Sequence, residues 1–405
     1  MIELQGKYNS CKVFAESIDD ATRGQLEALL NQPMVEGSQI RIMPDTHAGA
    51  GCVIGTTMTL KDKVVPNLVG VDIGCSVLSV QLKDKRINLT DLDSVIHKQI
   101  PSGMEVHKAP VTNVADLDKI KATVNIERAE LSLGTLGGGN HFIEVDRASD
   151  GTLWLVIHTG SRHLGLEVCK YYQDRGYEQL NIAQKGDIKE LRRALIDDYK
   201  AKGKETEIGD ALQALNDKYK SETIDVPYEL AYVEGTLFDD YIHDMRIVQA
   251  FASKNRATIA NRIIKAMGLK EVDRIETMHN YIDCDNLILR KGSISARENE
   301  RVLIPMNMRD GTLLCVGKGN ADWNYSAPHG AGRLMSRRQA RENIAMSDYK
   351  QSMKGIFTTC VNRGTVDESP MAYKPMESII EQVKETVDIL DILKPIYNFK
   401  AADNE

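Results

Sequence analysis

The sequence predicts a mixed fold of strands and helices. Short apolar runs at 154–157 and 302–314 have strand-like composition and end in turns or polar loops. Two longer stretches have helical patterns: 166–219, which is charged, and 238–267, which carries apolar residues at helical spacing. With 405 residues, the chain can form two ordinary domains or one large one.

Composition places the chain among soluble globular proteins, because 42% of its residues are hydrophobic and 27% are charged. The net charge of −7 argues against indiscriminate binding to nucleic acid. Two local basic clusters remain candidates for a groove, although each alone is equally typical of a solvated helix face. They are Lys254, Arg256, Arg262 and Lys265, and Arg333, Arg337, Arg338 and Arg341.

Cysteine usage indicates a reduced compartment. The seven cysteines are scattered and form no CxxC pair, so neither a disulfide framework nor a zinc ribbon is expected. The first residues lack the features of a secretory signal, and no apolar run approaches the length of a membrane span. We therefore expect a cytoplasmic protein without a membrane segment.

The first third of the chain contains the first candidate site. We expect short strands and a helix over about 19–30, then a strand from residue 40 that opens into a glycine-rich loop by residue 51. Asp45 and His47 in this segment either bind a ligand or cap the turn. A second strand leads to the loop at 69–76, and the alternation at 77–82 predicts a strand leaving it.

The loop at 69–76 combines a carboxylate and a thiol. Asp72 and Cys75 lie between glycines at the end of an apolar run over 64–71. A hard oxygen donor and a soft sulfur donor together suit a borderline metal such as Mn²⁺, Fe²⁺ or Zn²⁺. A single cysteine, however, is more often a small buried apolar residue.

A glycine-rich loop at 133–144 is the next candidate site. Its three consecutive glycines suit a backbone that approaches a ligand closely and offers N–H groups to an anion. The loop is neither a GxGxxG fingerprint nor a Walker motif. Asn140, His141 and Glu144 add an amide, an imidazole and a carboxylate beside it. The buried strand at 154–157 then ends at His158 and at Arg162, which could meet a phosphate.

The second half of the chain alternates between helices and further loops. We expect 166–219 to be a peripheral helical insertion broken at Gly176 and Gly203, and the apolar stripe of 238–267 to be core. The segment 290–293 places basic groups at a glycine turn. The imidazole of His329 should be open to a large ligand, because small residues follow it. We expect the arginine cluster that comes next to lie on a helix whose N-terminus faces the same loop.

Four of the nine histidines lie at the ends of apolar runs beside small or polar residues: His141, His158, His279 and His329. Together with Asp72 and Cys75 they favour a metal site. A metal, a loop suited to anions and scattered basic residues indicate phosphoryl chemistry on a nucleotide or nucleic acid. Two mechanisms remain open: a metal-bound water that hydrolyses a phosphoester, or a histidine that acts as a covalent nucleophile.

These residues, in this order, resemble the RtcB family of RNA ligases. The resemblance runs nearly from end to end of the chain. It implies a single α+β domain over 1–405, with central β-sheets, flanking helices and the helical insertion at 166–219. The stretches that carry it are MPDTHAGAG (43–51), GVDIGC (70–75), LGTLGGGNHFIE (133–144), IHTGSR (157–162), MHN (278–280), RKGS (290–293), GKGN (317–320), HGAGRLMSR (329–337), ESPMAYKP (368–375) and KPIYNFK (394–400).

The resemblance implies an enzyme that joins RNA ends carrying a 2′,3′-cyclic phosphate or 3′-phosphate to 5′-hydroxyl ends. It implies GTP and two Mn²⁺ ions as cofactors, and a role in RNA repair or tRNA splicing. His329 would take GMP as a phosphoramidate. The implied ligands are Asp72, Cys75 and His141 for one manganese, and Cys75, His158 and His279 for the other.

The same resemblance assigns further contacts. Phosphates would meet Arg162, Arg333, Arg337 and Arg338. The implied GTP contacts are Asn140, His141, Phe142, Ile143, Glu144, His279, Asn280, Pro305, Met306, Asn307, Met308, Thr312, His329, Gly330, Ala331, Gly332 and Lys400.

The chain departs from the family pattern at several positions, which suggests a divergent branch. Met306 and Asn307 stand where the family usually has glycine and serine, Ser76 and His163 replace common glycines, and residues 401–405 extend past Lys400. Two other functions compete with ligation: a metal-dependent phosphoesterase that opens cyclic phosphates without sealing, and a non-catalytic RNA-binding protein with a structural metal. Neither needs a reactive His329. The resemblance leaves open whether an activating protein partner takes part.

Overall fold

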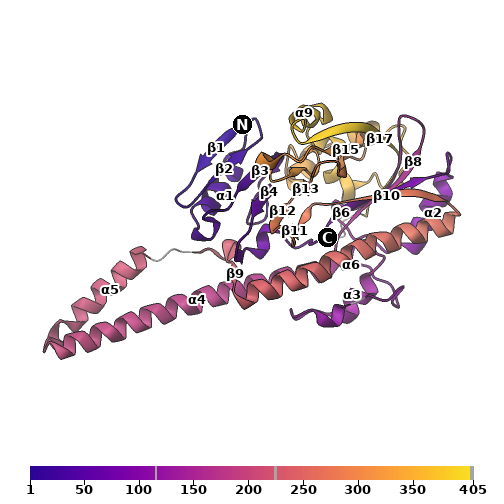
Figure 1. The fold of residues 1–405 in the computed structure, drawn as a ribbon. Coiled ribbons are helices and arrows are strands. Elements are labelled where there is room, and N and C mark those ends of the chain that lie inside the picture. Colours follow the sequence, from indigo (N-terminus) through magenta and orange to yellow (C-terminus); the bar gives the residue numbers. More distant parts are fainter. Residues whose placement is uncertain (115, 223–225, 402–405) are drawn as a thin grey trace.

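The structure is a computed structural model that describes residues 1–114, 116–222 and 226–401. It mixes helices and sheets in one body from which a helical arm projects (Figure 1). The α+β class expected from the sequence is therefore confirmed. The last four residues of the extension expected after Lys400 lie outside the described residues.

The N-terminal part of the chain forms most of a six-stranded sheet. Helix α1 (Asp20–Leu30) packs on it, and the side chain of Asp19 caps the helix by accepting a hydrogen bond from the N–H of Thr22. The predicted helix over 19–30 is thus confirmed. The strands, in their spatial order, are β1 (Ile2–Gln5), β2 (Ser10–Val13), β3 (Ile40–His47), β4 (Ile54–Thr59), β12 (Ile288–Lys291) and β11 (Asn280–Asp283).

A seven-stranded sheet forms the second half of the body. Its two outer strands, β10 and β14, contact each other, and the N–H of Leu303 donates to Thr277 Oγ1 at 3.0 Å. The sheet therefore curls around apolar residues such as Val77 and Trp154. The strands, in their spatial order, are β10 (Glu271–Met278), β6 (Ser76–Leu82), β8 (Leu153–Thr159), β7 (Phe142–Arg147), β17 (Val387–Phe399), β15 (Gly311–Gly317) and β14 (Arg301–Asn307).

Helices α2 (Leu89–Gln99) and α6 (Thr236–Met267) cover one face of this sheet. Tyr241, Met245, Val248 and Phe251 of α6 are buried, as the apolar stripe predicted. The remaining elements are β5 (Lys63–Val64), β9 (Val233–Glu234), β13 (Ser293–Ser295), β16 (Ser326–Pro328), α3 (Ile126–Ser132), α4 (Arg162–Ala201), α5 (Ile208–Glu222), α7 (Arg337–Asn343), α8 (Met346–Ser352) and α9 (Met376–Gln382).

Helix α4 differs from the sequence prediction in two respects. It is 40 residues long and passes through Gly176 without a break, whereas the chain does turn at Gly203. A Cβ at position 176 would lie 2.7 Å from the carbonyl oxygen of Tyr232, so glycine permits close packing there. The first turns of α4 also belong to the core, where Leu164 and Val168 are buried. Only the outer part of α4, with α5, forms the projecting arm (Figure 1).

Three further expectations need correction. The apolar run before Asp72 forms β5 and then a 3₁₀ turn at Pro66–Leu68 rather than a strand, because Pro66 has no N–H for a ladder. Arg290 lies within β12, buried, and donates to Ser326 and Tyr281 rather than to solvent. Arg256 is also buried and pairs with Glu276 at 2.6 Å, so it cannot line an open groove on α6.

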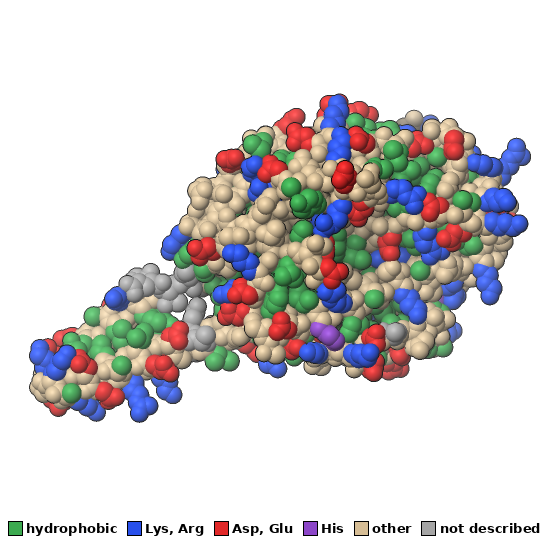
Figure 2. Space-filling model, in the orientation of Figure 1, with side chains coloured by type: hydrophobic (Ala, Val, Ile, Leu, Met, Phe, Trp, Pro, Cys, Tyr) green, Lys and Arg blue, Asp and Glu red, His purple; other side chains and the backbone are tan. Residues whose placement is uncertain are grey.

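Among the described helices, none has the length and apolar character needed to cross a membrane. Figure 2 shows acidic and basic side chains interspersed over the visible face of the body and of the arm.

Candidate metal centre and nucleotide pocket

The turn before β6 brings Asp72 and Cys75 to one place. Gly70 and Gly74 have φ angles of 93° and 72°, a region that glycine adopts without strain. The N–H of Gly74 donates to the carbonyl of Asn280 at 2.6 Å, which ties this turn to the segment after β10. Two parts of the chain that are distant in sequence therefore meet at the same site.

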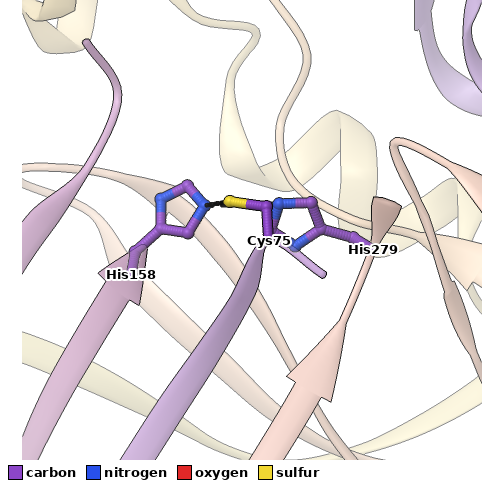
Figure 3. A group of neighbouring side chains, drawn as sticks. All are labelled: Cys75, His158 and His279. Atoms are coloured by element: carbon purple, nitrogen blue, oxygen red, sulfur yellow. Dashed lines mark hydrogen bonds between the residues drawn. The ribbon is translucent and has the colours of Figure 1, made fainter. Parts of the chain in front are cut away.

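Two groups of metal-capable side chains share Cys75. In the first group, His141 Nε2 lies 2.9 Å from Asp72 Oδ2 and 3.6 Å from Cys75 Sγ. In the second, His158 Nε2 lies 3.2 Å from the same sulfur and 3.3 Å from His279 Nε2 (Figure 3). The five residues expected from the sequence to bind metal are thus brought together.

The glycine-rich loop fixes which ring nitrogen of each histidine faces the thiol. His141 Nδ1 lies 3.0 Å from the carbonyl oxygen of Leu136, and His158 Nδ1 lies 3.1 Å from that of Asn140. Because a carbonyl can only accept, each Nδ1 carries the proton and each Nε2 has a free lone pair. The loop therefore supplies carbonyl oxygens here, a role that its glycines did not reveal in the sequence.

The protonation states suit a divalent cation. Burial and neighbouring positive groups lower the pKa of His158 and His279 well below the usual range, so both imidazoles are neutral. Burial raises the pKa of the Cys75 thiol, and the Asp72 carboxylate adds to this effect. A buried thiolate next to a carboxylate needs a strong positive charge, which a bound metal provides. The donor set of one carboxylate, one thiol and three imidazoles fits a borderline metal.

A pocket adjoins this centre, and His329 forms part of its wall. The ring centroids of His279 and His329 are 5.1 Å apart, so the pocket begins where the metal-capable cluster ends. Most of the residues expected to contact GTP line it: Asn140, Phe142, Glu144, His279, Pro305, Met306, Asn307, Met308, His329, Gly330, Ala331, Gly332 and Lys400.

Four of the expected GTP contacts lie elsewhere. Ile143 and Thr312 are buried in the sheet, and the Asn280 side chain accepts a hydrogen bond from the N–H of Gly292. His141 faces a second cavity on the other side of the cluster, together with Arg162 and Arg128. The guanidinium of Arg162 passes over Gly137, where any Cβ would overlap it.

His329 has a partner that the sequence did not identify. Its Nδ1 lies 2.7 Å from Asp45 Oδ2, and the Asp45 side chain is 0% exposed. The two residues are 284 positions apart, so no spacing rule could have paired them. The sequence indicates Asp45 only as a ligand or a turn cap.

A family model described as tRNA-splicing ligase RtcB matches this chain over residues 25–125 and 107–401. The chain belongs to the RtcB family.

Curated relatives support this assignment at modest identity. The chain is similar to "RNA-splicing ligase RtcB" of Escherichia coli (strain K12), with 27% identity over 423 residues that cover 94% of each chain. It is also similar to "tRNA-splicing ligase RtcB" of Aeropyrum pernix, with 27% identity covering 84% of this chain and 83% of the relative. For the protein of the same name from Nanoarchaeum equitans the identity is 23%, covering 97% and 93%. Such identities are consistent with a divergent branch of the RtcB family.

The departures from the RtcB pattern at the pocket now have a structural description. Asn307 Oδ1 accepts hydrogen bonds from the N–H groups of Arg309 and Asp310, both at 3.0 Å, so this side chain closes its own turn. The Met306 side chain is buried in an apolar cluster. At these two positions of the pocket wall, therefore, both side chains already make contacts within the protein.

Two acidic residues that were not expected at the site hold the basic side chains of the pocket in place. The buried Glu368 carboxylate meets Lys400 Nζ at 2.6 Å, Arg337 at 2.8 Å and Arg333 at 3.3 Å. Asp367 adds a second contact to Arg337 at 2.7 Å. Arg333 and Arg337 thereby line the pocket, whereas the Arg338 side chain is 87% exposed. The sequence does contain a sign of Glu368, because the stretch 368–375 is one of those that carry the resemblance, but the resemblance assigns no role to it.

Proposed function

We propose that this chain is a GTP- and Mn²⁺-dependent RNA ligase that joins 2′,3′-cyclic phosphate or 3′-phosphate ends to 5′-hydroxyl ends. The observation that carries the proposal is the position of His329, which contacts a buried carboxylate and adjoins both the metal-capable cluster and the pocket. The names of the RtcB relatives support ligation of RNA in RNA or tRNA splicing, and RNA repair is the other role that we propose. A single catalytic domain in the cytoplasm, with a helical insertion, belongs to the same proposal.

His329 is the nucleophile in this proposal. Asp45 Oδ2 accepts a hydrogen bond from Nδ1–H, so the lone pair lies on Nε2, and the carboxylate stabilises positive charge that develops on the ring. Nε2 attacks the α-phosphorus of GTP, a nitrogen–phosphorus bond forms, and pyrophosphate leaves with the electrons of the broken phosphorus–oxygen bond.

The two following steps transfer GMP and then seal the RNA. An oxygen of the RNA 3′-phosphate attacks the phosphorus on His329, and the nitrogen–phosphorus bond breaks, so that His329 is regenerated. The 5′-hydroxyl oxygen of the second strand then attacks the RNA phosphorus, releasing GMP and a proton. A cyclic phosphate must first be opened by water to a 3′-phosphate.

Asp72, Cys75 and His141 would hold one Mn²⁺, and Cys75, His158 and His279 the second. When bound, these ions supply positive charge that offsets the charge building up on the transferring phosphoryl groups. The protein contributes the orientation of each imidazole through the carbonyls of Leu136 and Asn140.

Charged groups in the pocket wall suit a nucleoside triphosphate. Lys400, Arg333 and Arg337 converge on Glu368, leaving an excess of positive charge for phosphate oxygens. Glu144 also lines the pocket, and its carboxylate suits the paired N–H groups of a guanine edge.

RNA phosphates would meet Arg162 and the exposed Arg338. The second cavity adds Arg128, whose buried Nε has no hydrogen-bond partner among the residues that the structure describes. A buried donor without a partner is costly, so a phosphate in this cavity would satisfy it.

The decisive experiment is incubation with GTP labelled at the α-phosphorus, together with Mn²⁺. We expect an acid-labile label on the wild-type protein and none on His329→Ala. His97→Ala is the matched control, because His97 does not line the pocket. A label that persists on His329→Ala would place the nucleophile elsewhere, and its absence from the wild type would favour the phosphoesterase or the binding protein.

A further inference from the structure

His47 lines the same pocket as His329, yet none of the steps above uses it. It is the last residue of β3 and pairs with Ile54 of β4, which lines the pocket too. The sequence alone left its role open between a ligand and a turn cap.

Asp45 orients both imidazoles. Its carboxylate accepts from His329 Nδ1, and its main-chain oxygen lies 3.0 Å from His47 Nδ1. The proton of His47 therefore resides on Nδ1, and Nε2 remains as a hydrogen-bond acceptor. One residue thus sets the tautomer of two histidines that line a single pocket.

His47 is neutral in this environment. Burial lowers the pKa of His47 and outweighs the opposite effect of the Asp45 main-chain oxygen and carboxylate, and the nearby Lys374 ammonium acts in the same direction as burial. Lys374 is held in place by donating to the carbonyl of Pro44 at 3.1 Å. A neutral acceptor cannot attract a phosphate, which the guanidinium and ammonium groups on Glu368 are suited to bind.

A neutral acceptor such as His47 Nε2 needs a hydrogen-bond donor on the nucleotide. Apart from the phosphates, a guanosine nucleotide offers two kinds of donor: its base N–H groups and its ribose hydroxyls. The Glu144 carboxylate suits the base, since it can accept two parallel N–H bonds. We infer that His47 Nε2 accepts a hydrogen bond from one of the two ribose hydroxyls of the nucleotide and so favours the ribonucleotide over the deoxy form that lacks this hydroxyl. This inference rests on the proposed function, because it takes the pocket to bind guanosine nucleotides.

The test measures binding without chemistry. GMP lacks a leaving group, so the dissociation constants of GMP, 2′-deoxyGMP and 3′-deoxyGMP can be compared by calorimetry. Wild-type protein should bind GMP roughly two- to tenfold more tightly than one of the deoxy forms, as expected for a neutral hydrogen bond. This preference should fall to about one in His47→Ala and be partly retained in His47→Gln, whose amide oxygen can accept. His97→Ala should keep it.

Self-labelling of the protein with GTP, 2′-deoxyGTP and 3′-deoxyGTP in the absence of RNA repeats the comparison during the first chemical step. Each ratio is measured within one variant, so a partly unfolded preparation does not alter it. An unchanged ratio in His47→Ala, or no preference in the wild type, would overturn the inference while leaving the ligase proposal intact. A defect confined to RNA sealing would assign His47 to the RNA hydroxyl instead, and failure of the wild type to bind GMP or react with GTP would count against the proposed function itself.

Discussion

Cys75 is the one residue common to both groups of metal-capable side chains. Two cations held close together repel each other, and a shared thiolate offsets this repulsion. We therefore expect Cys75→Ala to lose both Mn²⁺ ions, measured as metal content per chain. Cys11→Ala, at another buried free cysteine, is the control. Retention of two equivalents by Cys75→Ala would show that the sulfur is only a packing group.

Asp45 is the second residue at which a small change should have a large effect. Asp45→Asn removes the negative charge that stabilises the His329 ring, and its amide can stabilise the wrong tautomer. We expect self-labelling to slow by on the order of 10²-fold or more, measured in a single turnover. The main-chain oxygen of residue 45 is unaffected, so the contact to His47 should remain and the discrimination between GMP and its deoxy forms should persist. A labelling rate equal to that of the wild type would refute this role.

At the scale of elements, helix α7 presents two neighbouring arginines in different environments. Arg337 contacts the buried Asp367 and Glu368, whereas Arg338 is exposed and has a long ion pair with Glu342 at 3.9 Å. If Arg338 binds RNA, Arg338→Ala should weaken RNA affinity and reduce the slope of log affinity against log salt by about one. Self-labelling should be unchanged. RNA titrations at several salt concentrations measure both quantities, and an unchanged slope would move the RNA path away from α7.

Arg337→Ala should behave differently from Arg338→Ala. It leaves Asp367 without its contact at 2.7 Å and removes a positive group from the nucleotide pocket. Both unfolding free energy and self-labelling should therefore decrease, because the buried Asp367 loses its nearest positive partner and retains the longer contact to Arg341 at 3.5 Å. Urea denaturation and labelling of the two variants side by side provide the comparison.

Helix α4 contains a matched pair of glycines. Gly176 faces the carbonyl of Tyr232, where a Cβ would lie only 2.7 Å away, whereas an added Cβ at Gly186 has no heavy atom within 4 Å among the residues described. Gly176→Ala should lower the midpoint of urea denaturation, since the backbone must shift. Gly186→Ala should not lower it, and it adds up to about 1 kcal/mol of local helix stability. Equal effects of the two substitutions would contradict the packing explanation.

At the scale of the whole molecule, local patterns predicted the elements better than the contacts between them. The alternation over 77–82, the continuous apolar run at 154–157 and the helical spacing over 238–267 identified β6, β8 and α6, because each pattern is local in the sequence. The continuity of α4 through Gly176 depends on a contact with Tyr232 far along the chain, which periodicity does not encode. The partnership of Asp45 with His329 likewise exists only after β3 and the end of β16, far apart in the sequence, have come together. Residue types favoured a metal site among these side chains, and the resemblance implied which of them would share an ion, but neither indicated the carbonyls of Leu136 and Asn140 that orient two of the imidazoles.

Asp146 affects the stability of the whole body. It is buried in β7, and neither carboxylate oxygen has a hydrogen-bond partner within the described part of the chain. Burial raises its pKa well above the usual value, and the charge of Glu144 acts in the same direction. The folded chain therefore keeps this proton after the unfolded chain has released it near pH 4, so stability falls as pH rises. Asp146→Asn should flatten the loss of unfolding free energy that begins as the pH rises above about 4, the pKa of the unfolded carboxyl group. Identical pH profiles would exclude the effect.

Helix α4 begins at the candidate site and continues into the arm. One uninterrupted helix therefore has its first turns in the core and its last turns in the projecting arm. Amide hydrogens in its first turns, around Leu164 and Val168, are protected by the core and should exchange with deuterium only through global unfolding. Those of the outer turns, around Leu191, are exposed to frequent local opening. One continuous helix should therefore show two exchange regimes, with the boundary near the contact between Gly176 and Tyr232.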